Sequence, residues 1–373
     1  MTILRPTLIV VEEFCNRLQN RDDECVSECL MGGARMSQHS SKRATLSEVA
    51  ALAGVSRSAV SRAFTEGASV SVKTRSKVER AAQELGYRPN VLARSLTTRK
   101  TGLVGLVANN FHNPIFLEVF DLFTRQLQTV GLRPLIVNLT EETDPQRSVQ
   151  LLLEYQVDAV VVASSTLPVG FADSFSEAGI SVVHAFGRPT NRKDINVIGI
   201  DNIEAGRIAA RRLLASGYND VGFLGGPEKA TSTRDRLEGF LDVLSDYPKI
   251  KTRVHFAGDY TFEAGFDEMA SMILRGLSQA YFCADDVISI GAMSALRRAN
   301  FRIPEQIGII GFNDMEMAGW DNIRLTTIHQ PLDQIIEESV ICLKGMLTLN
   351  TRKTYQKLLP CHIVERDTLP ALS

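Results

Sequence analysis

The segment Thr45–Lys100 decides the fold, and it reads TLSEVAALAGVSRSAVSRAFTEGASVSVKTRSKVERAAQELGYRPNVLARSLTTRK. In its middle, Ala50, Gly54 and Val60 have the spacing of two short helices that meet at a tight turn. A small residue lets the second helix lie close, glycine allows a positive φ in the turn, and a β-branched residue packs the second helix against the first. We therefore predict a helix-turn-helix in which residues 56–64 form the helix offered to DNA.

Capping residues mark the helix boundaries in this segment. Thr45 and Glu48 have the spacing of a capping box, in which the hydroxyl accepts an amide hydrogen and the carboxylate reaches back. Ser56 is placed to cap the second helix, and Ser71 a third helix that Gly86 ends. The apolar residues of the second helix point inward, so its outward residues are Arg57, Ser58, Ser61 and Arg62.

A break and a short helix are predicted after the third helix. Arg88 precedes Pro89, and the residue before a proline is pushed out of the helical region. Residues 90–97 could form about two helical turns, a length that is marginal in isolation.

Charge is distributed unevenly along the chain. Residues 42–100 hold 12 Lys/Arg and 4 Asp/Glu, a balance of +8, which leaves −10 for the rest of a 373-residue chain with net charge −2. A basic module on an acidic body is typical of a phosphate-binding head joined to a regulatory domain.

From residue 103 onward, short apolar runs alternate with amphipathic helical stretches. Nine such runs begin at residues 103, 134, 159, 181, 197, 221, 254, 280 and 307. Buried strands alternating with helices indicate parallel sheets covered on both faces, and this many units favours two lobes with a ligand cleft between them. The predicted fold is an all-α helix-turn-helix head (44–101, with a hinge helix at 90–97) on a two-lobed α/β body (102–373).

Residues 1–43 form an N-terminal extension for which two hypotheses stay open. One is a disordered or partner-binding extension. The other is a misassigned start, with translation beginning at Met31 or Met36.

No apolar run reaches the roughly 18–20 residues of a membrane span, and the start lacks a signal-peptide cleavage site, so we expect a cytoplasmic protein. The six scattered cysteines fit reduced thiols, and no metal or cofactor is predicted.

With these motifs in hand, the chain resembles the lactose/purine repressor (LacI) family of bacterial transcription regulators over about residues 44–368. The head motif quoted above carries most of the resemblance. In the body, IGIDN, AYFCADD, IPEQIGIIGFND and LTTIHQP match in order. The resemblance implies a homodimer that binds palindromic operator DNA, and a body like periplasmic sugar-binding proteins. No leucine heptads follow residue 368, so we expect a dimer rather than a tetramer.

The resemblance also implies roles for residues of the head. Thr45 and Ser56 would contact phosphates, and Arg57, Ser58 and Arg62 would face bases of the major groove. Arginine can make a bidentate pair with guanine O6/N7. In the hinge, the resemblance implies DNA contacts by three residues, of which the last would be a minor-groove wedge that kinks the duplex: Asn90, Ala93 and Leu96.

In the body, seven residues fall at or near effector positions of the family: Asn113, Phe116, Phe186, Arg234, Asp285, Asn313 and Trp320. Arginine could fork to two hydroxyls, the Asp and Asn side chains could accept from hydroxyls, and the aromatic residues could cover a ring. Four of these residues also have a structural interpretation: Arg234 could belong to a structural ion pair, Asp285 could simply cap a helix, and Phe186 and Trp320 could belong to the core.

We therefore expect a repressor of a carbohydrate-utilisation operon with a sugar-like effector, and no enzyme. A nucleobase-type co-repressor stays open. So do a sugar-modifying enzyme with a DNA-binding head and a solute-binding module without DNA function. Catalytic motifs are missing: the six histidines are widely spaced without HExxH, Gly225-Gly226-Pro227 lacks the P-loop Lys, and no GxSxG occurs.

Overall fold

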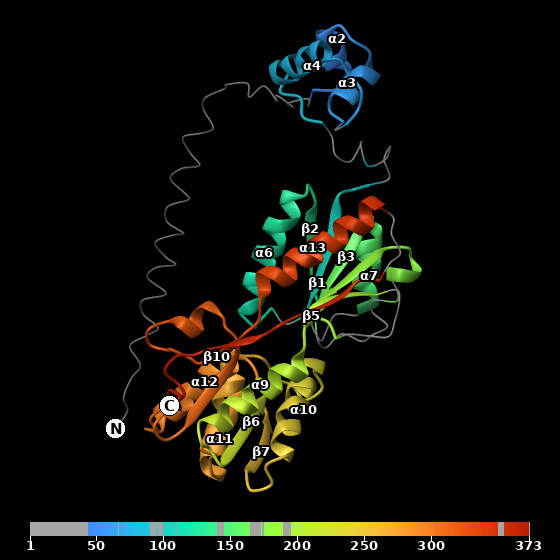
Figure 1. Cartoon of the computed structure of the whole chain (residues 1–373). Helices are drawn as coiled ribbons and strands as arrows, with labels where there is room; N and C mark the ends of the chain where they lie inside the picture. The colour runs from blue at the N-terminus through green and yellow to red at the C-terminus, as the bar shows by residue number, and fades with distance from the viewer. Residues whose placement is uncertain are drawn as a thin grey trace, which may run out of the picture. The chain divides into compact units, whose positions relative to one another are not determined.

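The computed structural model describes residues 44–65, 67–89, 95, 100–109, 111–139, 145–164, 173, 175–188, 195–349 and 354–372. The chain divides into two compact units, a head that ends at Asn90 and a body that begins at Val91. The extension at residues 1–43 lies outside the described residues. Each unit is described by itself (Figure 1).

The head consists of the three predicted helices, α2 (Leu46–Ala53), α3 (Arg57–Ala63) and α4 (Val72–Glu84). Gly54 ends α2 with φ 64°, the left-handed turn that only glycine adopts at no cost. The core of the head is made of small and β-branched side chains, which let three short helices approach closely: Val49, Ala50, Ala53, Val60, Ala63, Val78, Ala81 and Ala82.

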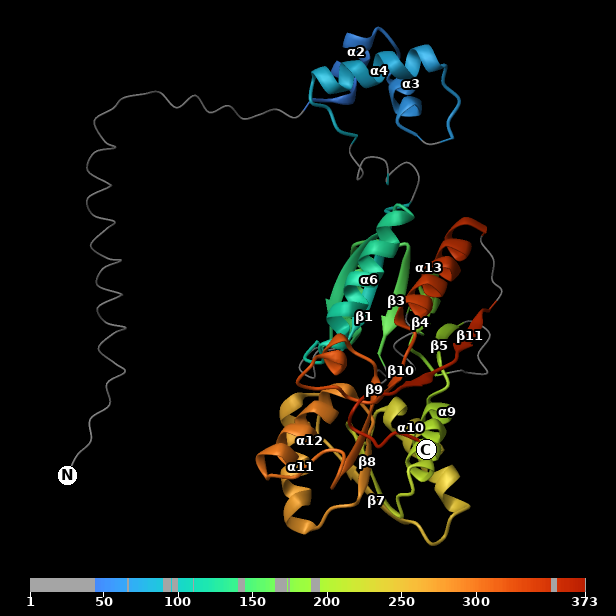
Figure 2. The same ribbon diagram turned by 60° about the vertical axis from the view of Figure 1, so that its left-hand side comes forward.

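The body has two lobes. Lobe 1 contains a six-stranded parallel sheet with strand order β11-β5-β4-β3-β1-β2. Its strands are β1 (Leu103–Ala108), β2 (Arg133–Asn138), β3 (Ala159–Ala163), β4 (Ser181–Ala185), β5 (Asn196–Ile200) and β11 (Gln356–Leu359). The helices are α6 (Ile115–Thr129), α7 (Pro145–Glu154) and α13 (Leu332–Leu349). Figure 2 shows α6 and α13 side by side.

The second sheet, in lobe 2, has strand order β12-β10-β9-β8-β6-β7. Its strands are β6 (Asp220–Gly225), β7 (Lys251–Phe256), β8 (Ala280–Cys283), β9 (Gly308–Asn313), β10 (Thr327–His329) and β12 (His362–Val364), the last antiparallel to β10. Its helices are α9 (Asn202–Ala215), α10 (Thr231–Ser245), α11 (Phe262–Arg275) and α12 (Asp286–Arg298), with a 3₁₀ turn at Glu316–Gly319.

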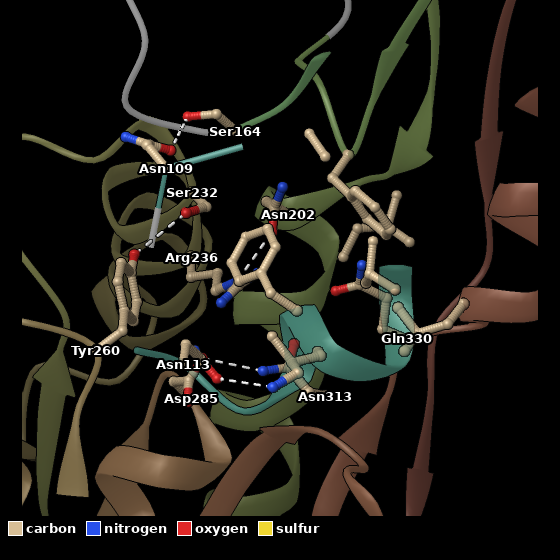
Figure 3. Close-up of a pocket in the computed structure, with 17 residues that line it drawn as sticks. Asn109, Asn113, Ser164, Asn202, Ser232, Arg236, Tyr260, Asp285, Asn313 and Gln330 are labelled. Carbon is tan, nitrogen blue, oxygen red and sulfur yellow. Dashed lines mark hydrogen bonds between the residues drawn. The ribbon is translucent and has the colours of Figure 1, made fainter. Parts of the chain in front are cut away.

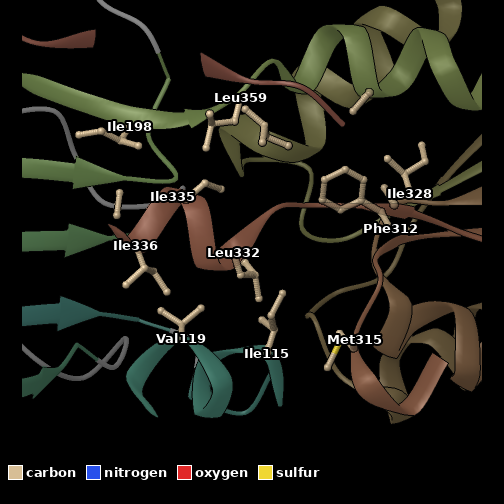
Figure 4. Packing of buried hydrophobic residues seen from close by; sticks show 14 of the residues in the cluster. Ile115, Val119, Ile198, Phe312, Met315, Ile328, Leu332, Ile335, Ile336 and Leu359 are labelled. Atoms are coloured by element: carbon tan, nitrogen blue, oxygen red, sulfur yellow. The ribbon is translucent and has the colours of Figure 1, made fainter. Parts of the chain in front are cut away.

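The chain passes between the lobes three times, from β5 to α9, from β10 to α13 and from β11 to β12. One buried apolar cluster continues across this junction (Figure 4): Ile115 and Leu332 of lobe 1 belong to the same cluster as Phe312 and Ile328 of lobe 2. A shared core limits the relative motion of the lobes to a few arrangements, because packed interiors do not deform continuously.

The predicted fold class is confirmed, and the nine predicted strands correspond to β1–β9. The strands β10, β11 and β12 were not among the predictions. They have only three or four residues each, and their patterns of buried residues are too short to show a period.

Candidate DNA-binding surface and ligand cavity

The helix α3 presents a polar face to solvent. Arg57, Ser58, Ser61 and Arg62 are all exposed, while Val60 is fully buried against the other helices. The Ser56 hydroxyl accepts the Ala59 amide hydrogen at 3.2 Å and so begins the helix. The two arginines therefore stand on the free face of a helix whose orientation is fixed by its buried side, as reading of a DNA groove requires.

The capping box at the start of α2 is present. The Glu48 amide donates to Thr45 Oγ1 at 3.3 Å, and Glu48 Oε2 accepts from the Thr45 backbone nitrogen at 2.6 Å and from its hydroxyl at 2.9 Å. Thr45 is exposed, and its phosphate contact stays a prediction. The three predicted hinge contacts, Asn90, Ala93 and Leu96, lie outside the described residues.

In the body, a cavity of about 730 Å³, in part open to solvent, lies where the two lobes meet. The described residues that line it come from both lobes (Figure 3): Asn109, Asn113, Ile115, Phe116, Val119, Ala163, Ser164, Phe186, Ile200, Asn202, Ser232, Arg236, Tyr260, Asp285, Asn313, Gln330 and Leu332. Only Arg236 and Asp285 among them carry a charge, so the lining is neutral overall.

Arg236 is the cation of this cavity and is 7% exposed. Its Nε donates to Asn202 Oδ1 at 2.8 Å, an Nη donates to the Ala284 carbonyl at 2.7 Å, and the guanidinium lies 3.4 Å from the centre of the Phe312 ring. Burial lowers the pKa of the guanidinium. Because these contacts use only part of its five N–H donors, the group can still donate to a ligand.

Asp285, the anion of the cavity, follows β8 and caps α12. Its Oδ1 accepts the Val287 amide hydrogen at 2.9 Å, and its Oδ2 accepts side-chain amide hydrogens from Asn113 and Asn313, each at 3.0 Å (Figure 3). Burial raises the pKa of this carboxyl to about 6, although these hydrogen bonds and Arg236 oppose the shift. The capping role considered from the sequence is therefore real, and it coexists with a place in the cavity.

Tyr260 was missed by the sequence reasoning. It is 7% exposed, and its hydroxyl bonds with Thr233 Oγ1 at 2.7 Å and Ser232 Oγ at 3.3 Å. A Cβ at Gly226 would meet the Tyr260 ring at 2.3 Å, so the glycine makes room for the ring. Gly226 follows β6, as a glycine of a phosphate loop would, but here it leaves space for the Tyr260 side chain to reach the cavity.

Of the three aromatic residues predicted from the sequence as effector contacts, two line the cavity and the third, Trp320, does not. Phe116 and Phe186 line the cavity, and Phe186 has φ 65°, an uncommon value for a residue with a bulky side chain. Its backbone is held by a hydrogen bond from its amide to the Ile198 carbonyl at 2.8 Å. Strained backbone of this kind clusters at binding sites, where the surroundings fix it.

Arg234 and Trp320, also predicted as effector contacts, are not among the described residues that line the cavity. Arg234 is exposed, its Nε donates to the Glu228 carbonyl at 3.0 Å, and it does not line the cavity. Trp320 is 52% exposed and is also absent from the lining. The reason that Arg234 points away from the cavity is the turn of α10, since residues two apart point to nearly opposite sides of a helix. Arg236, not Arg234, faces inward.

Asp286, next to Asp285, gives a testable dependence of stability on pH. It is fully buried, accepts from Thr327 Oγ1 at 2.6 Å and from the Met315 amide at 2.8 Å, and burial raises its pKa to about 7 from an ordinary 3.8. The folded body thus binds this proton more tightly than the unfolded chain. Its stabilising contribution is full below about pH 4 and is lost as the pH rises through 7.

We therefore expect the free energy of unfolding of the body to be lower at pH 8 than at pH 5.5, by an amount on the order of a few kcal/mol. Urea unfolding at the two pH values measures it. In Asp286→Asn the difference should shrink, because the titrating group is gone. An equal pH dependence in wild type and variant would show that Asp286 is not responsible.

No helix of the described part of the chain is long and apolar enough to cross a membrane. Within the same residues, no group of three or more His, Cys, Asp or Glu side chains is placed to hold a metal ion.

A helix-turn-helix head joined to a two-lobed body with a neutral, polar and aromatic cavity defines a class, that of DNA-binding regulators with a ligand-binding domain.

The comparisons with known proteins agree with this class. A family model described as bacterial regulatory proteins, lacI family, matches residues 45–90, and one described as a periplasmic binding protein-like domain matches residues 210–369. The transcriptional regulator CelR of Thermobifida fusca is 30% identical over 337 residues, covering 88% of this chain and 98% of that protein. AscG of Escherichia coli K12 is 28% identical, covering 88% and 99%.

Solved structures extend the similarity to the whole fold. The lac repressor dimer bound to operator and the anti-inducer ONPF has a TM-score of 0.78 at 27% identity, covering 88% of this chain and all of that one. The complex of the regulator CelR with cellobiose has a TM-score of 0.65 at 27% identity, covering 87% and 100%. The chain belongs to the LacI family of bacterial regulatory proteins and is a DNA-binding transcription regulator. Its relatives named here are transcription regulators rather than enzymes.

Proposed function

We propose that this protein is a cytoplasmic homodimeric repressor without enzymatic activity, whose affinity for a palindromic operator is controlled by a small, uncharged, sugar-like effector in the cavity between the lobes. The observation that carries the proposal is the composition of the cavity. Among the described residues of its lining, one cation and one anion balance each other beside amide, hydroxyl and aromatic side chains. Hydroxyl groups of a sugar both donate and accept, and so suit such a lining.

The structures of relatives support the same ligand class. One holds cellobiose, and another holds the anti-inducer ONPF together with operator DNA. In this chain Arg236 would donate to ligand oxygens, Asp285 would accept from hydroxyls, and Tyr260, Phe116 and Phe186 would cover the apolar face of a ring. A nucleobase would use the same rings, so it belongs in the test.

A thermal-shift screen against neutral sugars, sugar acids, polyols and nucleobases tests the effector class. A ligand that binds only the folded state raises its stability by RT ln(1 + [L]/Kd). We expect a neutral sugar to give the largest shift and a sugar acid to give little. If a nucleobase alone raised the melting temperature, the proposed effector class would be wrong.

In the head, Arg57→Ala should weaken binding to the operator by roughly 5- to 150-fold and relax the preference at one base pair, because a bidentate arginine–guanine pair is worth about 1–3 kcal/mol. The matched variant Arg57→Lys keeps the charge but loses the fork. It should recover part of the affinity without the base preference.

Selection of bound duplexes from a random pool, followed by fluorescence anisotropy, measures both effects of these Arg57 variants. A variant that loses affinity equally for every sequence would place Arg57 on the phosphate backbone instead.

A further inference from the structure

The hydrogen bond between Asn113 and Asp285 joins the two lobes across the cavity. Asn113 lies just before α6 in lobe 1, and Asp285 begins α12 in lobe 2. Both side chains are 3% exposed, and the bond from Asn113 Nδ2 to Asp285 Oδ2 is 3.0 Å long. A charge-assisted hydrogen bond in such a dry place is stronger than one in water.

Asn113 has little capacity left for a ligand. Its Oδ1 accepts the Ile115 amide hydrogen at 3.2 Å at the start of α6, and its Nδ2 is directed at Asp285 (Figure 3). The amide is thus fixed at both ends, one within lobe 1 and one across to lobe 2. This arrangement suits a structural bridge better than a ligand contact.

A ligand that donates to Asp285 Oδ2 must compete for this oxygen. The oxygen already accepts from Asn113 and from Asn313, which belongs to lobe 2 like Asp285 itself. A carboxylate oxygen has two lone pairs, so a ligand hydroxyl that donates to this oxygen displaces one of the two amides. Displacing Asn313 would leave the lobes joined, whereas displacing Asn113 would free them.

The backbone indicates which amide is held more firmly. Asn313 has φ 120° and the next residue, Asp314, has φ 61°, both uncommon for residues other than glycine. This segment is fixed by the buried Asp286, which accepts the Met315 amide hydrogen at 2.8 Å. The backbone of Asn313 is therefore held by contacts within lobe 2, the lobe of Asp285 itself. Asn113 belongs to lobe 1, so its hydrogen bond to Asp285 depends on the arrangement of the two lobes.

We propose that Asn113 and Asp285 form a latch that holds the lobes in the arrangement described above, and that a hydroxyl of the effector replaces Asn113 on Asp285 Oδ2. This rests on the proposed function, and it describes how the same cavity is regulated. Breaking the latch would convert ligand binding into a change of lobe arrangement. Asn113 is then a positioning residue, and its loss favours the arrangement that the ligand stabilises.

Two variants of the full-length protein separate the latch from the hydrogen bond that Asn113 accepts at the start of α6. Asn113→Ser keeps a side-chain oxygen for the Ile115 amide but is too short to reach Asp285, and Asn113→Ala removes both functions. Without ligand, we expect amide hydrogen exchange in residues 113–117 and 285–289 to be about 3- to 10-fold faster in both variants than in wild type. Exchange at the wild-type rate in the serine variant would overturn the latch.

Calorimetry with cellobiose tests the displacement. Because the ligand no longer works against the latch, Asn113→Ser should bind cellobiose about 3- to 10-fold more tightly than wild type. Tenfold weaker binding would mean that Asn113 contacts the ligand directly, and would overturn the displacement. If wild type gave no heat with cellobiose, the proposed function would fail for this sugar, while the exchange rates would still confirm or overturn the latch.

Discussion

Arg236→Ala should abolish binding of the effector, whereas Arg234→Ala should leave its affinity within about twofold of wild type. The two residues are neighbours on α10, yet only Arg236 reaches the cavity. Truncating a buried, hydrogen-bonded charge costs about 2–5 kcal/mol, so we expect a loss of affinity of roughly 30-fold or more. Arg234 is exposed and donates to the carbonyl of Glu228, which precedes α10, and its loss removes nothing from the lining of the cavity.

Calorimetry with the best ligand of the thermal-shift screen measures both affinities. Arg236→Ala also leaves Asn202 Oδ1 and the Ala284 carbonyl without this partner, so Arg236→Lys serves as a milder variant that keeps the charge. Circular dichroism and a preserved operator affinity would show that each variant is folded. The account would be wrong if Arg234→Ala abolished binding and Arg236→Lys did not.

The second large effect is on stability, and it concerns Gly239 in α10. A Cβ at this position would lie 1.8 Å from the Ile203 carbonyl oxygen, and a Cβ at Gly206 in α9 would lie 2.0 Å from the Arg236 carbonyl oxygen. The two helices therefore touch backbone to backbone. Gly239→Ala must push them apart, at a cost of about 3 kcal/mol or more. It would also displace Arg236, which lies one turn away on the same helix.

We expect Gly239→Ala to lower the melting temperature of the body by roughly 6–12 °C, at about 2–4 °C per kcal/mol for a domain of this size. The control is Gly345→Ala in α13, where an added Cβ meets nothing within 4 Å. That substitution should leave the melting temperature unchanged or raise it slightly, because alanine favours a helix. Equal melting temperatures for the two variants would contradict the close approach of α9 and α10.

The head could be predicted from the sequence almost completely, because its signals are local. The cap residues Thr45, Ser56 and Ser71, and the glycine that ends α2, each act within four residues of themselves. The strands β1–β9 were also predictable, since a continuous apolar run is typical of a strand that is buried on both faces.

The cavity was predicted less well, because its residues come from distant parts of the chain. Arg234 and Arg236 could have been distinguished by the helix period, since Thr233, Arg236 and Phe240 share the buried face of α10. Tyr260 carried no comparable signal. It reaches the cavity because Gly226, far away in the sequence, leaves space for its ring.

The hydrogen bond that Asn113 makes to the other lobe could not be predicted from the sequence either. The residue precedes a proline and a helix, and its side chain accepts the Ile115 amide hydrogen at the start of α6. Its second hydrogen bond joins it to a residue 172 positions away, and only the pairing of the two lobes creates that contact.

The central claim is that a ligand between the lobes controls the affinity of the head for DNA. The most direct measurement is an anisotropy titration of the selected operator duplex, with and without a saturating concentration of the best ligand, at fixed salt. The account predicts an operator Kd that changes by roughly 5- to 150-fold with the ligand, and by much less in Arg236→Lys. The same operator Kd with and without a ligand that calorimetry shows to be bound would contradict it.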